Sequence, residues 1–303
     1  MATHLPTDCA SYWQRLLDEL ATYPAQPEVE PIPLRSTDFA TLYGVRLTSV
    51  GPYRIFGYLS IPTGDGPFPA MYYTPKYQSV LEIIPQGTAN LQRSQYIIWS
   101  LASRGQRNAD TPFAGMFPGL LTEGIAHADS YMFRGIVADS VRGLEYLLTR
   151  PELDASRLVV VGNDLTLLTA ALHPGATHVV TTPALFYDTV NLAQRTTAYP
   201  LEEINDYLRM FPTQAEAVCR TLAYYDLRSF ASRVSATTLL MAGAPSSLLS
   251  SQALAPLIEA LPATVTVHDS EQSSYKDGLY AETWMATQCG ITDVQRILPE
   301  HWR

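Results

Sequence analysis

The fold is decided by residues 159–166, which read VVVGNDLT. The β-branched run predicts a buried strand that ends at Gly162, and a helix is expected to follow. A strand that passes through a glycine and one further residue into a helix has the layout of the nucleophile elbow, G-x-S-x-G. The matching residues here are G-N-D-L-T, so Asp164 stands where that motif has its serine.

Strand-like and helical segments alternate along most of the chain. The expected strands lie at residues 70–73, 95–101, 157–162, 178–182, 237–243 and 264–268, and helical periodicity runs through 134–149 and 251–261. Such alternation predicts an α/β fold with a doubly wound, mostly parallel sheet. Residues 42–49 and 53–61, separated by Gly51-Pro52, predict an antiparallel hairpin that starts the sheet.

Two further segments complete the expected single domain of residues 1–303. Residues 8–33 are predicted to hold an amphipathic N-terminal helix, whose apolar pattern begins at Tyr12 and Trp13, and a proline-rich lead-in. Residues 187–232 have helical character, are rich in charged and aromatic side chains, and interrupt the alternation of strands. We interpret residues 187–232 as a helical insertion, and insertions at such positions often cover a pocket.

Composition excludes several classes of protein. The chain has 303 residues, of which 47% are apolar and 16% charged, so it has enough apolar material for a large core. Asp and Glu outnumber Lys and Arg by 29 to 20, and the basic residues are scattered, so we expect no nucleic-acid partner. The apolar runs are shorter than a membrane span requires, so we expect no membrane partner.

Cysteine and histidine usage points to a cytoplasmic protein without a metal. The 3 cysteines are widely spaced, and no basic, apolar leader begins the sequence, so we expect reduced thiols and a cytoplasmic location. His127, His173 and His178 lack metal-ligand spacing with one another or with cysteine. We therefore expect no metal and no cofactor.

Several short motifs occur in a characteristic order along the chain. They are Tyr12-Trp13, Ile55-Phe56-Gly57-Tyr58, Arg104-Gly105-Gln106, Tyr131 with Arg134-Gly135, Asp139 with Arg142, Asp154-Ala155-Ser156-Arg157, Tyr199-Pro200 with Glu203-Ile204, and Leu222-Ala223-Tyr224-Tyr225-Asp226. In these motifs, residues 8–290 resemble the acetyl xylan esterase and cephalosporin C deacetylase family. The resemblance implies the α/β-hydrolase fold and a homo-oligomer, commonly a hexamer.

The resemblance also implies a catalytic triad of serine, aspartate and histidine, but each is missing from its matching position. Asp164 replaces the serine, and no serine occurs between Ser156 and Ser229. By spacing, Ser246 occupies the place of the acid and Ser273 that of the histidine. Because loss of one triad member typically removes several orders of magnitude of rate, we predict that serine-esterase activity has lapsed.

The oxyanion hole implied by the resemblance is altered as well. The family has a His-Gly-Tyr segment where this chain has Pro75-Lys76-Tyr77, so Lys76 brings a new charge to the expected pocket. Tyr77 is kept, and its backbone N–H is expected to donate to an oxyanion together with that of Leu165. The expected lining of this degenerate pocket is Lys76, Tyr77, Leu165, Ser246 and Ser273.

The residues leave three functions open, with a small molecule as the expected ligand or substrate where the pocket is kept. The first is a pseudoenzyme on the esterase scaffold, a binding or structural protein in which the old pocket holds a small ligand or is filled. The second is an enzyme with changed chemistry: either a hydrolase in which Asp164 forms an ester intermediate and His268 activates water, or a non-covalent lyase, cyclase or decarboxylase. The third is a carbohydrate or antibiotic deacetylase with a different nucleophile.

Overall fold

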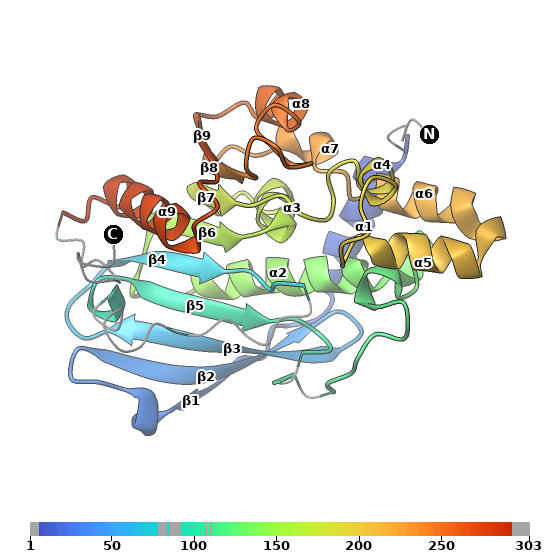
Figure 1. Ribbon diagram of the computed structural model, residues 1–303. Helices are drawn as coiled ribbons and strands as arrows, with labels where there is room; N and C mark the ends of the chain where they lie inside the picture. The colour runs from blue at the N-terminus through green and yellow to red at the C-terminus, as the bar shows by residue number, and fades with distance from the viewer. Residues whose placement is uncertain (1–5, 78–83, 85–91, 107, 110, 293–303) are drawn as a thin grey trace.

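The structure is a computed structural model, and it describes residues 6–77, 84, 92–106, 108–109 and 111–292. One 9-stranded sheet forms its centre, in the order β1-β2-β3-β5-β4-β6-β7-β8-β9 (Figure 1). The strands are β1 (Glu28–Pro31), β2 (Ala40–Ser49), β3 (Tyr53–Pro62), β4 (Phe68–Tyr73), β5 (Ile97–Ala102), β6 (Leu153–Gly162), β7 (His178–Thr181), β8 (Thr237–Ala242) and β9 (Val265–Asp269).

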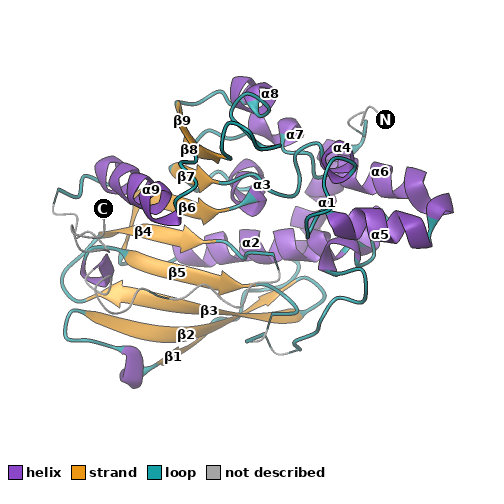
Figure 2. Ribbon diagram, viewed as in Figure 1, coloured by secondary structure: helices purple, strands orange, loops and turns teal. Residues whose placement is uncertain are grey.

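Helices cover the sheet and extend beyond one end of it (Figure 2). The α-helices are α1 (Cys9–Ala21), α2 (Met132–Leu148), α3 (Asp164–Leu172), α4 (Thr189–Ala193), α5 (Glu202–Met210), α6 (Ala215–Ala223), α7 (Arg228–Ala231), α8 (Ala255–Ala260) and α9 (Ser274–Gln288). Short 3-10 helices are η1 (Pro33–Arg35), η3 (Leu120–Thr122), η4 (Ala128–Ser130) and η5 (Pro212–Gln214). In the described part of the chain, no helix has the length and apolar character needed to cross a membrane.

The strand directions confirm the predicted architecture. The pairs β1–β2, β2–β3 and β3–β5 are antiparallel, whereas every pairing from β5 through β4 to β9 is parallel. The predicted hairpin is therefore present as β2 and β3, and the doubly wound parallel part follows it. Residues 187–232 carry α4 to α7, as the helical pattern predicted.

The two faces of the sheet are covered by different helices. Leu16 of α1, Leu144 of α2 and Leu168 of α3 belong to one large buried cluster. Met285 of α9 belongs to a second cluster, together with Val159 of β6. Because successive strand residues point to opposite faces, α3 and α9 lie on opposite sides of the parallel strands.

Two elements were not predicted from the sequence. Strand β1 forms within the proline-rich lead-in by pairing its backbone with β2, although all four of its side chains are exposed. Helix α9 follows the last strand, in a stretch for which the sequence predicted no element. Helix α8 is shorter than the predicted 251–261, because turns occupy the first residues of that stretch.

A buried ion pair joins the end of β5 to α2. The Asp139 carboxylate is fully buried and accepts hydrogen bonds from the backbone N–H of Arg104 at 2.8 Å, from its Nε at 2.9 Å and from its Nη2 at 2.8 Å. The Arg104 guanidinium also donates to the carbonyl of Val50 at 3.1 Å. Arg104 therefore links the turn after β2 to helix α2.

We expect Asp139→Ala to lower the free energy of unfolding by about 3–5 kcal/mol, because it leaves the Arg104 guanidinium without its buried counter-charge. Urea unfolding followed by circular dichroism measures the change. Asp65 is exposed, and Asp65→Ala is the matched control, with an expected change of less than about 0.5 kcal/mol. Equal midpoints for the two variants would show that the ion pair does not support the fold.

Candidate functional site

The turn after β6 keeps the first glycine of the elbow and loses the strain. Gly162 has φ 154°, and a Cβ there would overlap Oγ1 of Thr74, so only glycine fits. Asn163 has φ −104° and ψ −143°, and Asp164 is already the first residue of α3. Thr166 replaces the second glycine and donates its hydroxyl to the Asn163 carbonyl at 2.6 Å. The nucleophile position is thus part of a regular helix.

The Asp164 carboxylate is an acceptor for three consecutive backbone amides. Oδ1 accepts from the N–H groups of Ala184 at 3.2 Å, Leu185 at 3.1 Å and Phe186 at 2.9 Å. Oδ2 accepts from Ala184 at 3.1 Å and from Leu185 at 3.0 Å. Asp164 is only 1% exposed, and burial raises the pKa of its carboxyl, while the amide donors act in the opposite direction.

This geometry makes Asp164 a link between two parts of the carboxyl edge of the sheet. The amides that it holds follow β7 and lead directly into the insertion at residues 187–232. A nucleophile needs a lone pair that faces the substrate. Here both carboxylate oxygens face backbone donors, so the side chain is engaged in holding the chain in place.

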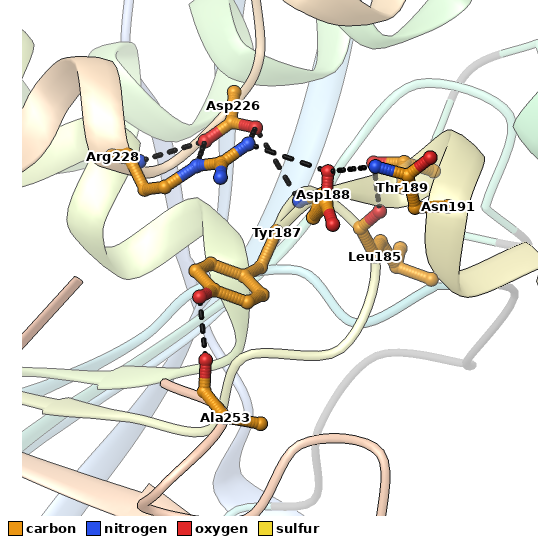
Figure 3. Close-up of polar contacts among 8 residues, drawn as sticks. All are labelled: Leu185, Tyr187, Asp188, Thr189, Asn191, Asp226, Arg228 and Ala253. Carbon is orange, nitrogen blue, oxygen red and sulfur yellow. Dashed lines mark hydrogen bonds and ion pairs between the residues drawn. The ribbon is translucent and has the colours of Figure 1, made fainter. Parts of the chain in front are cut away.

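The insertion is closed at its base by a polar network, drawn in Figure 3. Asp226 accepts from Nε of Arg228 at 2.8 Å, from its Nη2 at 2.6 Å and from the backbone N–H of Asp188 at 3.3 Å. Tyr187 donates its hydroxyl to the carbonyl of Ala253 at 2.6 Å, and the Arg228 guanidinium lies 5.3 Å from its ring centre. The network joins Tyr187 and Asp188, at the start of the insertion, to Asp226 and Arg228 near its end.

The structure does not bring His268 to Asp164. His268 lies on β9, where its Nε2 is 2.8 Å from Oδ1 of Asp277 and its ring stacks on Tyr280 at 4.1 Å. Both partners belong to α9, which covers the sheet face opposite to α3. The β6 and β9 strands are three strand positions apart, which corresponds to about 14 Å. His268 is therefore not a base for Asp164.

The two serines that spacing matched to the acid and the histidine of the triad have structural surroundings. Ser246 is exposed in the turn between β8 and α8. Ser273 is the N-cap of α9, where its hydroxyl accepts from the backbone N–H of Lys276 at 3.3 Å. Neither has a hydrogen bond to Asp164 in the part of the chain that the structure describes. The spacing that aligned these serines with an acid and a histidine thus does not gather them in one site.

At the predicted oxyanion hole, Leu165 belongs to the large buried cluster, and the partly buried Tyr77 packs against the same cluster. Lys76 is exposed, and its backbone carbonyl accepts from Nε2 of Gln106 at 3.1 Å. The Tyr77 hydroxyl donates to Oε1 of Glu203 on α5. Tyr77, one of the predicted lining residues, therefore contacts the insertion.

Glu203 was missed as a site residue by sequence reasoning. It is 2% exposed, and its Oε2 accepts from the backbone N–H of Leu121 at 2.9 Å. Burial raises the pKa of the Glu203 carboxyl, and burial together with the bond to Glu203 raises the pKa of Tyr77. The sequence feature that could have identified Glu203 is its place beside the apolar Ile204 in a motif of the insertion.

Aromatic rings fill the space between the elbow, α1 and the insertion. Phe133 stands edge-on to Phe186 at 4.9 Å, and Phe186 is tilted against Tyr225 at 5.2 Å. Tyr225 meets Tyr131 edge-on at 5.1 Å, and its hydroxyl is 3.1 Å from that of Tyr12. All five rings are buried. Among the described residues, no three His, Cys, Asp or Glu side chains gather where they would hold a metal ion.

Two comparisons with known sequences both find acetyl esterases. The sequence model of the acetyl xylan esterase (AXE1) family matches residues 1–250. The acetyl esterase Axe7A of Xylanibacter ruminicola is 26% identical over 245 residues, which are 77% of this chain and 55% of that protein. The chain therefore spans about half the length of this curated relative.

Solved structures share the fold. Acetyl xylan esterase 1 from Thermoanaerobacterium sp. JW/SL YS485 has a TM-score of 0.82 at 22% identity, over 95% of both chains. The acetyl xylan esterase from Paenibacillus sp. R4 has a TM-score of 0.79 at 22% identity, over 95% of this chain and 96% of that one. The α/β hydrolase GrgF from Penicillium sp. sh18 has a TM-score of 0.54 at 11% identity, over 82% and 99%. The predicted α/β-hydrolase fold is thereby confirmed.

We expect Asp164→Ala to lower the free energy of unfolding by about 3 kcal/mol, since it leaves buried amides of Ala184, Leu185 and Phe186 without an acceptor. Asp164→Asn keeps one acceptor oxygen and is expected to cost about half as much. Denaturant unfolding measures both changes. Asp129→Ala, at an exposed position, is the control with an expected change within about 0.5 kcal/mol. An unchanged midpoint for Asp164→Ala would contradict the anchoring role.

Proposed function

Because the chain belongs to the acetyl xylan esterase family, whose sequence model matches residues 1–250, we propose that it is a divergent member without serine-esterase activity that binds a small molecule. The observation that carries this proposal is the environment of Asp164. Its carboxylate is buried at the nucleophile position and bonded to three backbone amides, so the position is used for structure. Membership of the family indicates the fold, whereas the function is inferred from the residues at the site.

The absence of a triad at the matched positions supports the same proposal. Serine hydrolysis requires a hydroxyl, a base within hydrogen-bond reach and an orienting acid. The three matched positions hold Asp164, Ser246 and Ser273, which are a helix residue, an exposed turn residue and a helix cap. None of these side chains is a base for another.

A hydrolase based on Asp164 is the alternative with a defined chemistry, and the geometry favours it less. That mechanism needs an exposed carboxylate and a histidine that activates water to cleave the ester intermediate. Asp164 is 1% exposed, and His268 pairs with Asp277 on the opposite face of the sheet. For a non-covalent lyase, cyclase or decarboxylase, no described contact favours a particular acid or base.

A homo-oligomer belongs to the proposal. The resemblance to the family implies a hexamer, and Met116 and Phe117 are 75% and 66% exposed, which is unusual for large apolar side chains unless another surface covers them. Sedimentation velocity at micromolar concentration is expected to give a mass several times that of one chain. A monomer under these conditions would contradict this part of the proposal.

A fluorophosphonate probe tests the loss of serine chemistry, because it labels only an activated serine hydroxyl. We expect no labelling of the purified protein, and we expect p-nitrophenyl acetate to be hydrolysed no faster by the wild type than by Asp164→Ala. The Thermoanaerobacterium acetyl xylan esterase is the positive control. Stoichiometric labelling, or acetate release that Asp164→Ala abolishes, would overturn the proposal.

The Asp164 alternative has its own test. If Asp164 formed an ester that water cleaves, a single turnover in ¹⁸O-labelled water would place the label in its carboxylate. Mass spectrometry of the peptide that contains residues 159–166 measures this. We expect no incorporation after incubation with p-nitrophenyl acetate, and incorporation would establish the covalent route.

A further inference from the structure

Glu203 enters the former active-site region from the insertion as a buried carboxylate. It lies in the first turn of α5, and its two oxygens accept from the Tyr77 hydroxyl and from the backbone N–H of Leu121 at 2.9 Å. A Cβ on Gly119 would overlap the carboxyl group, so glycine is needed for the backbone to approach it. We call Tyr77, Gly119 and Leu121 the cradle.

The cradle has the properties of a carboxylate-binding site. Its parts come from the segment after β4 and from the start of η3, and the carboxylate comes from a third element, α5. Within the described ranges, no Lys, Arg or His forms an ion pair with Glu203. Burial of a carboxylate against neutral donors is unfavourable unless the donors are well placed, and an apolar residue would fill the same space more cheaply.

The cradle adjoins the elbow through aromatic rings. The Tyr77 ring lies parallel to that of Phe133 at a centroid distance of 6.4 Å, and Phe133 stands edge-on to Phe186 at 4.9 Å. The backbone N–H of Phe186 in turn donates to Asp164 at 2.9 Å. Tyr77 also holds the position that was predicted to face the pocket. A ligand of the former active site would therefore meet the cradle.

We propose that the cradle binds a carboxylate, and that Glu203 occupies it as an internal ligand that holds the insertion against the body of the protein. An external ligand of this site then carries a carboxylate group of its own and replaces Glu203, which releases α5. This inference rests on the proposed function as a small-molecule binder and names the chemical class of the ligand. It requires no covalent step.

Replacement of Glu203 by alanine provides a direct test, because it removes a CH2–COO⁻ group of the size of acetate. We expect sodium acetate to raise the melting temperature of Glu203→Ala in a saturable way, by about 2–3 °C at ten times its dissociation constant. Sodium chloride at equal ionic strength and neutral acetamide are expected to have no saturable effect. The wild type is expected not to respond, since Glu203 fills the cradle.

Two variants show whether acetate binds in the cradle. Glu202 is the neighbouring residue, and its carboxylate pairs with Arg209 at 2.5 Å. Glu202→Ala removes this carboxylate and is expected to give no acetate response. Adding Tyr77→Phe to Glu203→Ala removes the hydroxyl donor and is expected to weaken acetate binding about tenfold or more. Equal acetate affinity with and without the Tyr77 hydroxyl would overturn the inference.

Folding of the variant is itself informative. If Glu203→Ala is unfolded in buffer, recovery of its far-UV circular dichroism by acetate, and not by chloride, supports the cradle. Lack of any acetate response, in the folded or the unfolded variant, overturns it. Esterase activity with a normal acetate response would refute only the proposed loss of serine chemistry, so failure of the proposed function and failure of the cradle are distinguished.

Discussion

The hydrogen bonds of the buried Asp164 carboxylate determine how the rest of the site is arranged. A carboxylate in the interior is stable only when donors replace the water that it lost. Here the backbone amides of Ala184, Leu185 and Phe186 do so, and hydrogen bonds to a charged acceptor are stronger than neutral ones. The same bonds fix the segment after β7, which positions Tyr187 and Asp188 for the network that closes the insertion. The carboxylate that orders this segment therefore has both of its oxygens engaged by backbone donors.

Much of the fold follows from local sequence pattern, because buried parallel strands and amphipathic helices have periodicities that a sequence displays. The strands β4 to β9, the hairpin of β2 and β3, and helix α2 lie within a few residues of their predicted positions. Strand β1 has only exposed side chains and exists through backbone pairing with β2, which leaves no apolar pattern. Helix α9 buries little besides Met285 and Ala286, so its amphipathic signal is weak.

The site was less predictable, because its contacts join residues that are far apart in sequence. The elbow pattern located Asp164 at the turn, and the resemblance to the family placed Tyr77 near it. However, the partners of Asp164 lie 20 to 22 residues away, and the Tyr77–Glu203 contact spans 126 residues. The position of His268 near the end of a strand was predicted correctly, but the face of the sheet to which its side chain points was not predicted. Val267 packs toward the cluster that contains α3, so its neighbour His268 points to α9.

Asp164 and Glu203 each place a buried carboxylate on hydrogen-bond donors near the carboxyl edge of the sheet. In doubly wound α/β folds, ligands bind beyond the carboxyl ends of the strands. In this chain two internal carboxylates occupy donors in that region, one on backbone amides and one on the cradle. A group that is part of the chain loses no translational entropy when it binds, whereas an external ligand does. Glu203 therefore outcompetes a weak external ligand. Asp164 is fixed by the helix that carries it, whereas Glu203 sits on an insertion that joins the body through separate contacts. Of the two, Glu203 is therefore the carboxylate that a ligand is able to replace without dismantling the sheet.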